Sequence, residues 1–237
     1  NITIEAEYAG YDGYLSKVMT QIASGTLPNI IQMDQPWLGS IINKNPDAFL
    51  NLNDYTDNLE LSVYEKSDLA NYCTYDDVLV GVPFTMNGFV MFTNNTLLDN
   101  AGITLPEQLS WDDLITYGNQ LRTYNEKASL LSAAWPEYDL LFRMYVTQHT
   151  GKDFMDAENY APNFDEAALE DAFTYFQKMF TSGATPDAEV VALYGADPYT
   201  DPDRINGNLA IAFSGPNDWS YCVSSFPEGI STGYTNF

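Results

Sequence analysis

The sequence is poor in the residues on which many catalytic and metal sites depend. It contains one histidine, His149, and two cysteines, Cys73 and Cys222, in 237 residues. The lone histidine excludes a multi-histidine metal site and argues against a histidine-based triad. Its place just before Gly151 predicts a surface or helix-capping role instead. The cysteines are far apart and lack metal-ligand spacing, so they predict neither a disulfide-dense scaffold nor a zinc site.

Basic residues are also scarce. The chain has 9 Lys+Arg against 33 Asp+Glu, a formal net charge of −24, and no basic residue between Lys66 and Arg122. Such a surface repels nucleic-acid phosphates and anionic lipid headgroups, which excludes nucleic acid as a partner and disfavours a polyanionic ligand. The main interpretation is that the charge keeps an exported protein soluble. Steering of cationic ligands is the alternative.

Long apolar runs and nucleotide-binding motifs are missing too. No apolar run approaches the ~20 residues that span a bilayer. There is no P-loop, no G-x-G-x-x-G and no G-x-S-x-G, so no cofactor is predicted. The chain shows no signal peptide and no initiator Met, and it opens inside a strand-like segment. We therefore expect a processed or trimmed chain.

What is present suffices for a folded core. The composition is 45% hydrophobic and 14% aromatic, which disfavours intrinsic disorder, and the length fits one large domain or two small ones. Alternating apolar residues predict a strand over 2–8, and helical spacing predicts a helix over 15–22 that ends at Gly25. The apolar run 30–33 predicts a buried strand. Together these segments indicate a parallel βαβ unit.

Further along the chain the pattern changes to longer helices. Strands are predicted at 78–82, 89–92 and 209–213, and helices after Ser110 and Asp165, which are good N-cap residues. No internal repeat or low-complexity linker is present. The change of pattern predicts two lobes joined near residues 83–88.

One acid-rich segment, 197–207, invites comparison with a calcium loop. An EF-hand needs an oxygen ligand at its fifth position and glycine at its sixth. Counted from Asp201, those places hold Ile205 and Asn206. The segment is therefore interpreted as a turn and helix cap, and no metal site is predicted.

Three tryptophans are the most informative residues. Trp37, Trp135 and Trp219 each follow a predicted strand, beside Pro or Gly and among polar side chains. Ligands of open α/β sheets bind outside the carboxyl ends of strands. An indole next to Asp, Asn or Gln suits a sugar, because its face packs on the ring while polar groups reach the hydroxyls. Packing in the core is the alternative for each tryptophan taken alone.

Four ordered segments carry a family resemblance. They are residues 14–34 (YLSKVMTQIASGTLPNIIQMD), 80–95 (VGVPFTMNGFVMFTNN), 98–114 (LDNAGITLPEQLSWDDL) and 206–219 (NGNLAIAFSGPNDW). They resemble successive blocks of the carbohydrate-type (family 1) extracellular solute-binding proteins of bacterial ABC importers, relatives of maltose-binding protein. Asn29 departs from the Asp that is usual in the first block.

The resemblance implies an α/β, periplasmic-binding-protein-like (type II) two-lobed fold that is incomplete in this chain. It implies an N-terminal lobe over 1–84 that lacks its first strand and helix. It also implies a C-terminal lobe over 85–237 that lacks its C-terminal segment.

Carried over position by position, the resemblance implies ligand contacts on loops at strand ends. The residues are Asp34, Gln35 and Trp37 after the strand at 30–33, Asn87 at the crossover, Trp135, Glu137 and Tyr138 in one turn, and Asn217 and Trp219 after the last strand, with Tyr11 and Asp12 as further candidates.

The function that the resemblance implies is a sugar or oligosaccharide receptor that closes about the link at 83–88. It would have no catalytic residues and would deliver its ligand to the membrane permease of an ABC importer. It would be monomeric at full length and extracellular, either periplasmic or a cell-surface lipoprotein. The alternatives are a receptor for a non-sugar solute, such as a peptide or polyamine, and a glycoside hydrolase that uses two of the many carboxylates.

Overall fold

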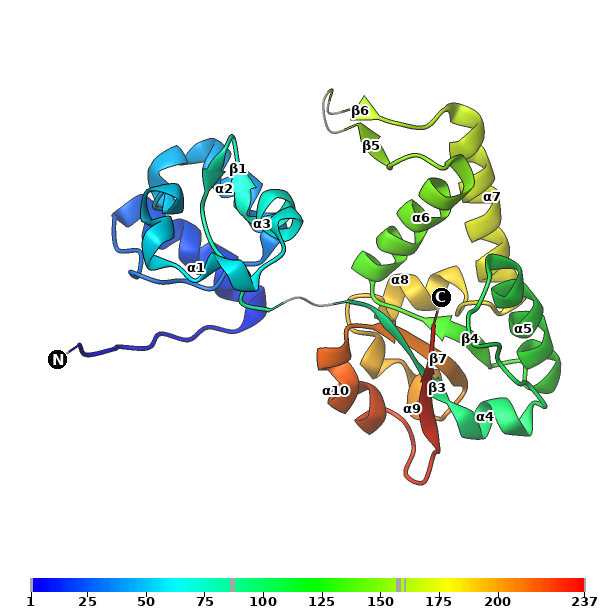
Figure 1. Ribbon diagram of the computed structural model, residues 1–237. Helices are drawn as coiled ribbons and strands as arrows, with labels where there is room; N and C mark the ends of the chain where they lie inside the picture. Colours follow the sequence, from blue (N-terminus) through cyan, green and yellow to red (C-terminus); the bar gives the residue numbers. More distant parts are fainter. Residues whose placement is uncertain (1, 86–87, 157–158, 160, 237) are drawn as a thin grey trace. The chain divides into compact units, whose positions relative to one another are not determined.

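The protein separates into two compact units, Asn1–Met86 and Asn87–Phe237, which are described one at a time. The computed structural model describes residues 2–85, 88–156, 159 and 161–236, and the side chains of residues 11, 12 and 217 lie outside that description. Figure 1 shows the helices and strands of each unit along the chain. The boundary between residues 84 and 85 that the family resemblance implies stays a prediction.

Unit 1 is mainly helical. It contains α1 (Tyr11–Ser24), α2 (Gln35–Lys44) and α3 (Lys66–Cys73), the 3₁₀ turns η1 (Pro46–Ala48), η2 (Leu52–Asn58) and η3 (Leu61–Val63), and a hairpin of β1 (Thr74–Tyr75) with β2 (Val78–Leu79). The predicted end of the first helix is confirmed, because Gly25 caps α1 at φ 68°, a conformation that glycine adopts without strain. Its small core consists of Val18, Leu38, Ile41, Cys73 and Leu79.

The βαβ unit predicted at the start of the chain is not formed. Residues 2–8 and 30–33 have no strand assignment, and the side chains of Ile2 and Ile30 are more than 90% exposed. A strand is stabilised when a neighbour takes up its backbone hydrogen bonds. Among the described residues no strand pairs with either segment. Apolar alternation alone therefore did not make them strands.

The strand predicted over 78–82 is shorter and antiparallel. Only Val78–Leu79 forms a strand, and it pairs with β1 through Thr74 opposite Leu79. The turn between the two strands places Asp76 and Asp77 at φ 46° and 63°. Two successive positive φ values are those of the tight turns that match the twist of a hairpin.

Unit 2 is built on a mixed sheet. Its strand order is β4-β7-β3-β8, with β4 (Ser129–Ser132), β7 (Leu209–Ser214), β3 (Val90–Asn94) and β8 (Thr232–Thr235). β4 runs parallel to β7, and β3 runs antiparallel to both β7 and β8. The strands predicted at 89–92 and 209–213 are confirmed as β3 and β7 within two residues. β4 and β8, which have only four residues each, were not predicted from the sequence.

Helices cover both faces of this sheet. They are α4 (Asn95–Asn100), α5 (Trp111–Tyr124), α6 (Trp135–Thr150), α7 (Glu166–Ser182), α8 (Ala188–Tyr194), α9 (Pro202–Ile205) and α10 (Trp219–Ser224). Met91, Ile211 and Phe213 belong to the main core with α5, α6 and α7, while Phe92 and Ala212 pack with Cys222 of α10. This alternation along β3 and β7 is the two-residue period of a strand. The small β5 (Met155–Asp156)–β6 (Ala161–Pro162) hairpin connects α6 to α7 (Figure 1).

The predicted helix caps of unit 2 are confirmed. Ser110 Oγ accepts from the backbone N–H of Asp113, whose carboxylate in turn accepts from the backbone N–H of Ser110. This reciprocal capping box satisfies two N–H groups at the start of α5. Asp165 Oδ1 accepts from the backbone N–H of Ala168 at the start of α7. His149 lies in the last turn of α6 and stacks on Tyr145 at 3.8 Å between ring centroids.

A close approach of two backbones holds α5 against the loop after α7. A Cβ added to Gly118 of α5 would lie 2.3 Å from the backbone nitrogen of Ala184. The substitution Gly118→Ala should therefore lower the free energy of unfolding of unit 2 by about 1–3 kcal/mol. Alanine in an uncrowded helix would instead raise it by up to ~1 kcal/mol.

Urea denaturation followed by circular dichroism measures this difference. Thr123→Ala, on the exposed side of α5, is the matched control and should change the free energy by no more than about 0.5 kcal/mol. A Gly118→Ala variant as stable as the parent would contradict the packing argument.

Candidate functional site

A pocket in unit 2 opens where β4 and β7 end. These two strands are parallel, so their carboxyl ends lie at the same edge of the sheet, the edge at which open α/β sheets bind ligands. The cavity volume is about 130 Å³, below the roughly 300–1,000 Å³ of pockets that enclose a small molecule. It therefore suits one edge of a ligand. The lining comprises Ser132, Ala133, Ala134, Glu137, Ala196, Asp197, Pro198, Tyr199, Arg204, Ala212, Phe213, Ser214 and Asp218.

Glu137 enters the pocket from the first turn of α6. The helix begins directly after β4, with Pro136 in its first turn and no capping side chain on Ala134. Among the described residues the buried Oε2 atom of Glu137 has no hydrogen-bond partner. Burial raises the pKa of this carboxyl and the nearby Asp218 raises it further, while the backbone N–H groups of Glu137 and Ala134 act in the opposite direction.

Three lining residues, Tyr199, Ser214 and Asp218, are joined by hydrogen bonds. Tyr199 Oη lies 3.2 Å from Ser214 Oγ, and Ser214 Oγ donates to Asp218 Oδ2 at 2.5 Å. Tyr199 Oη also lies 3.5 Å from the Sγ atom of Cys222. Burial raises the pKa of the Tyr199 phenol, so the side chain stays a neutral donor. These hydrogen bonds hold the carboxylate of Asp218 in the lining.

Arg204 is the cationic group of this pocket. Its side chain is 1% exposed, and its guanidinium lies over the rings of Tyr199 and Phe226 at 4.6 and 5.1 Å from their centroids. Arg204 Nε donates to Ser225 Oγ at 2.6 Å, whereas Nη2 has no hydrogen-bond partner among the described residues. Burial lowers the pKa of the guanidinium, and the neighbouring Cys222, Tyr199 and Asp201 act against this. A buried arginine of this kind needs polar partners to offset its desolvation.

The acid-rich segment 197–207 builds part of this wall, and its interpretation as turn and cap is confirmed. Asp197 Oδ1 accepts from the backbone N–H of Tyr199 to cap η4 (Pro198–Thr200). Asp201 Oδ1 accepts from the backbone N–H of Asp203 to cap α9. Among the residues that the structure describes, no group of three His, Cys, Asp or Glu side chains is placed to hold a metal ion.

Two of the predicted tryptophans flank the lining in sequence. Trp135 begins α6 and is half-exposed, with its Nε1 donating to the carbonyl of Val191 at 3.0 Å. Trp219 directly follows Asp218 and is 41% exposed, and one side of its ring packs on Phe92 at 5.1 Å between centroids. Each indole is thus held in place while part of its surface remains open.

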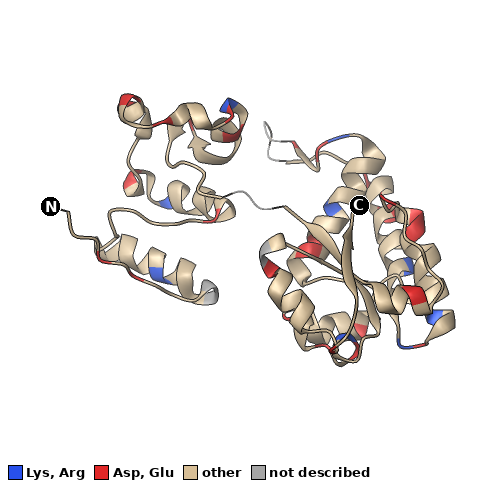
Figure 2. Ribbon diagram, turned by 60° about the horizontal axis from the view of Figure 1, so that its bottom comes forward, with Lys and Arg blue, Asp and Glu red and all other residues tan. Residues whose placement is uncertain are grey.

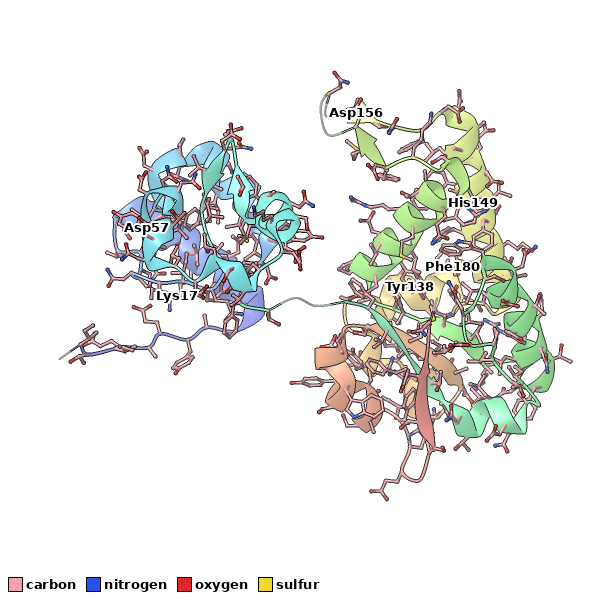
Figure 3. The ribbon with its side chains drawn as sticks, in the orientation of Figure 1. Lys17, Asp57, Tyr138, His149, Asp156 and Phe180 are labelled. Atoms are coloured by element: carbon pink, nitrogen blue, oxygen red, sulfur yellow. The ribbon has the colours of Figure 1, made fainter. Side chains whose placement is uncertain are left out.

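Tyr138 lies elsewhere. Its side chain is buried, its ring packs against Phe180 of α7 at 6.1 Å between centroids, and it does not line the pocket (Figure 3). Residues 137 and 138 point in different directions because neighbours on a helix are about 100° apart. The structure therefore gives Tyr138 a packing position between α6 and α7.

The candidates of unit 1 gather at the start of α2. Asp34 precedes the helix, Gln35 Nε2 donates to Tyr75 Oη at 3.3 Å, and the Trp37 ring stacks on Tyr14 at 6.2 Å between centroids. Asn87 and the side chains of Tyr11, Asp12 and Asn217 lie outside the described residues.

Sequence reasoning missed most of the pocket lining. Ser132, Asp197, Tyr199, Arg204 and Asp218 were not singled out as ligand residues. The available signals were the position of Asp218 beside Trp219 and the single arginine within the acid-rich segment. Neither signal shows that two segments meet at the end of β7.

The chain is similar in sequence and in fold to known proteins. Residues 1–226 match the family described as bacterial extracellular solute-binding protein. A periplasmic solute-binding protein of Pectobacterium atrosepticum superposes with a TM-score of 0.86 at 28% identity, over 99% of this chain and 58% of that one. A Yersinia enterocolitica oligogalacturonide-binding protein, solved with saturated digalacturonic acid, superposes with a TM-score of 0.81 at 24% identity, over 99% and 58%. The latter likeness shows the fold alone.

A curated relative is also similar. The arabinooligosaccharide-binding protein of Halalkalibacterium halodurans is 23% identical over 158 residues, which are 65% of this chain and 34% of the relative. The chain thus spans little more than half the length of the two solved structures and a third of this relative. No helix among the described residues is long and apolar enough to cross a membrane.

The buried carboxyl of Glu137 should make stability depend on pH. Its pKa is raised on folding, so the stability associated with its protonated form is present below the unfolded-state pKa of about 4.5 and is lost as pH rises through the folded-state pKa. Compared with Glu137→Gln, the parent should therefore lose unfolding free energy as pH rises from 4 to 7. Urea denaturation across this range measures the difference.

Glu170→Gln, on an exposed position of α7, is the matched control. Its unfolding free energy should change with pH in the same way as that of the parent. If the difference between the parent and Glu137→Gln stayed constant from pH 4 to 7, the carboxyl would not be desolvated on folding.

Proposed function

Because the chain belongs to the bacterial extracellular solute-binding protein family, we propose that it is the ligand-binding part of a sugar or oligosaccharide receptor. The receptor acts outside the cytoplasm, in the periplasm or as a lipoprotein at the cell surface. It delivers its ligand to the membrane permease of an ABC importer and works as a monomer. The arabinooligosaccharide-binding relative supports an oligosaccharide as the ligand.

The observation that carries this proposal is the pocket at the end of β4 and β7. It combines hydrogen-bonding groups on its walls with two part-exposed indoles next to them in sequence. Saccharides need both features, because their hydroxyls require polar partners and the faces of their rings are apolar. A cavity of about 130 Å³ accepts one edge of a sugar ring and leaves the remainder for other surfaces.

Further ligand contacts are proposed from the sequence. In unit 1 the proposed ligand contacts are Asp34, Gln35 and Trp37. Additional candidates are Tyr11, Asn87 and Asn217. The proposed mechanism is closure of the two units about the link at 83–88. A ligand drives closure only as far as it binds the closed state more tightly than the open one.

The receptor is proposed to act without catalysis. Glu137 and Asp218 line one pocket, and hydrolysis of a glycoside by such a carboxylate pair is the alternative. Release of product from a chromogenic glycoside, lost in Glu137→Gln, would support that alternative. A polyamine or peptide is the other alternative, and a thermal shift with spermidine but with no saccharide would support it.

Trp219 provides the sharpest test of sugar binding. Trp219→Ala should weaken the affinity of the full-length protein for an oligosaccharide about tenfold, equivalent to ~1.4 kcal/mol, because it removes an aromatic face. Trp219→Phe keeps a ring at this position and should retain most of the affinity. Isothermal titration calorimetry against arabino-, malto-, xylo- and galacto-oligosaccharides measures both.

Tyr234→Ala removes an exposed aromatic side chain on the edge strand β8 and is the matched control with no expected effect. If no saccharide of this panel bound the full-length protein, the proposed function would be wrong. Unchanged affinity in Trp219→Ala would remove this residue from the site.

A further inference from the structure

We propose that the pocket of unit 2 selects a saccharide whose edge carries hydroxyl groups and rejects one that carries a carboxylate. This inference rests on the proposed function and concerns the class of sugar. Similarity to known proteins does not decide between a charged and a neutral sugar. One solved neighbour holds digalacturonic acid, a uronate, whereas the curated relative is named as an arabinooligosaccharide-binding protein.

The first argument is the charge of the lining. Glu137, Asp197 and Asp218 supply three carboxylates, and Arg204 supplies one guanidinium. A ligand carboxylate would be a fourth negative group. Asp197 is exposed, but Glu137 and Asp218 are partly buried, which reduces the screening of their charges by water. The rest of the chain adds to the repulsion, since Figure 2 shows acidic residues spread over both units and basic ones few.

The second argument is that Glu137 occupies the place that would favour an anion. The first turn of a helix carries partial positive charge and backbone N–H groups without partners within the helix. α6 is 16 residues long and begins at the pocket wall, with Glu137 in its first turn and Ala133 and Ala134 in the lining. The protein's own carboxylate is thus already bound where a ligand carboxylate would gain most.

The third argument comes from the two buried atoms without partners. Glu137 Oε2 is an acceptor and Arg204 Nη2 is a donor; both residues line the pocket, and Arg204 also lines a second cavity of unit 2. A hydroxyl donates and accepts, so the hydroxyls on one edge of a sugar satisfy both atoms. An ionised carboxylate only accepts, so it would serve Arg204 and leave Glu137 Oε2 unsatisfied and repelled. An unsatisfied buried polar atom costs more than a formed hydrogen bond contributes.

Arg204 does not reverse this preference. Its guanidinium lies over the rings of Tyr199 and Phe226, its Nε donates to Ser225 Oγ, and the residue is 1% exposed. The carboxylate of Asp201 also acts on its charge. Its Nη2 group is a buried donor without a hydrogen-bond partner among the described residues, so Arg204 adds one such donor to a lining of net negative charge.

Matched pairs of saccharides test the inference on the full-length protein. Each pair compares a neutral oligosaccharide with the uronate of the same linkage, for example galactobiose with digalacturonate and cellobiose with its uronate. Isothermal titration calorimetry at constant ionic strength should give at least tenfold tighter binding of the neutral member. The arabino-, malto- and xylo-oligosaccharides of the earlier panel show whether any saccharide binds at all.

Glu137→Gln removes one negative charge with little change in shape. The ratio of neutral to uronate affinity should fall at least threefold in this variant, because repulsion of the uronate is reduced. Glu170→Gln, with its side chain exposed on α7, is the matched control and should leave the ratio unchanged. Circular dichroism confirms that both variants are folded.

The outcomes separate the two proposals. Uronate binding equal to or tighter than neutral binding overturns the inference and leaves the receptor function standing. If neutral saccharides bind but Glu137→Gln does not change the ratio of neutral to uronate affinity, the role given to Glu137 is overturned. If no saccharide binds, the proposed function is contradicted, and the inference fails with it.

Discussion

The parallel pairing of β4 with β7 is the constraint on which the rest of unit 2 depends. Because the two strands run the same way, both end at one edge of the sheet. The chain leaves β4 into α6, and it leaves β7 into the 3₁₀ turn η5 (Pro216–Asp218) and α10. That edge receives the first turn of α6 together with the loop that carries Asp218. The same pairing aligns apolar residues on both faces of the sheet, so the core and the pocket follow from one register.

The sequence predicted those elements of unit 2 whose signals are local. Ser110 and Asp165 were identified as N-caps because the cap lies within three residues of the N–H that it accepts. β3 and β7 were identified because apolar residues mark them. β4 was missed because four residues are too few for a period, and its burial comes from neighbours distant in the chain. In unit 1, the alternation over 2–8 was read as a strand, but strand formation depends on a pairing partner that periodicity does not reveal.

The same limit applies to the candidate site. Trp135, Glu137 and Trp219 were predicted from their positions at strand ends and from family resemblance, and of these Glu137 lines the pocket. Arg204 and Tyr199 were not predicted, because their place in the pocket depends on how the segment 197–207 folds back over β7 and α10. Tyr138 adjoins Glu137 in sequence but belongs to the core on the next helical position, against Phe180. A residue's neighbours along the chain therefore identify the turn but not the direction of each side chain.

The overall charge of −24 and the charge of the pocket have different consequences. The surface charge acts over a Debye length of about 8 Å at physiological salt and disfavours any anion before contact. The pocket acts only on the group that enters it, where Glu137 Oε2 requires a donor and Arg204 Nη2 requires an acceptor. A uronate with its carboxylate far from this edge would meet only the first effect, and a neutral sugar meets neither. Selection by the pocket therefore depends on which edge of the sugar is presented, and the surface charge alone cannot supply that discrimination.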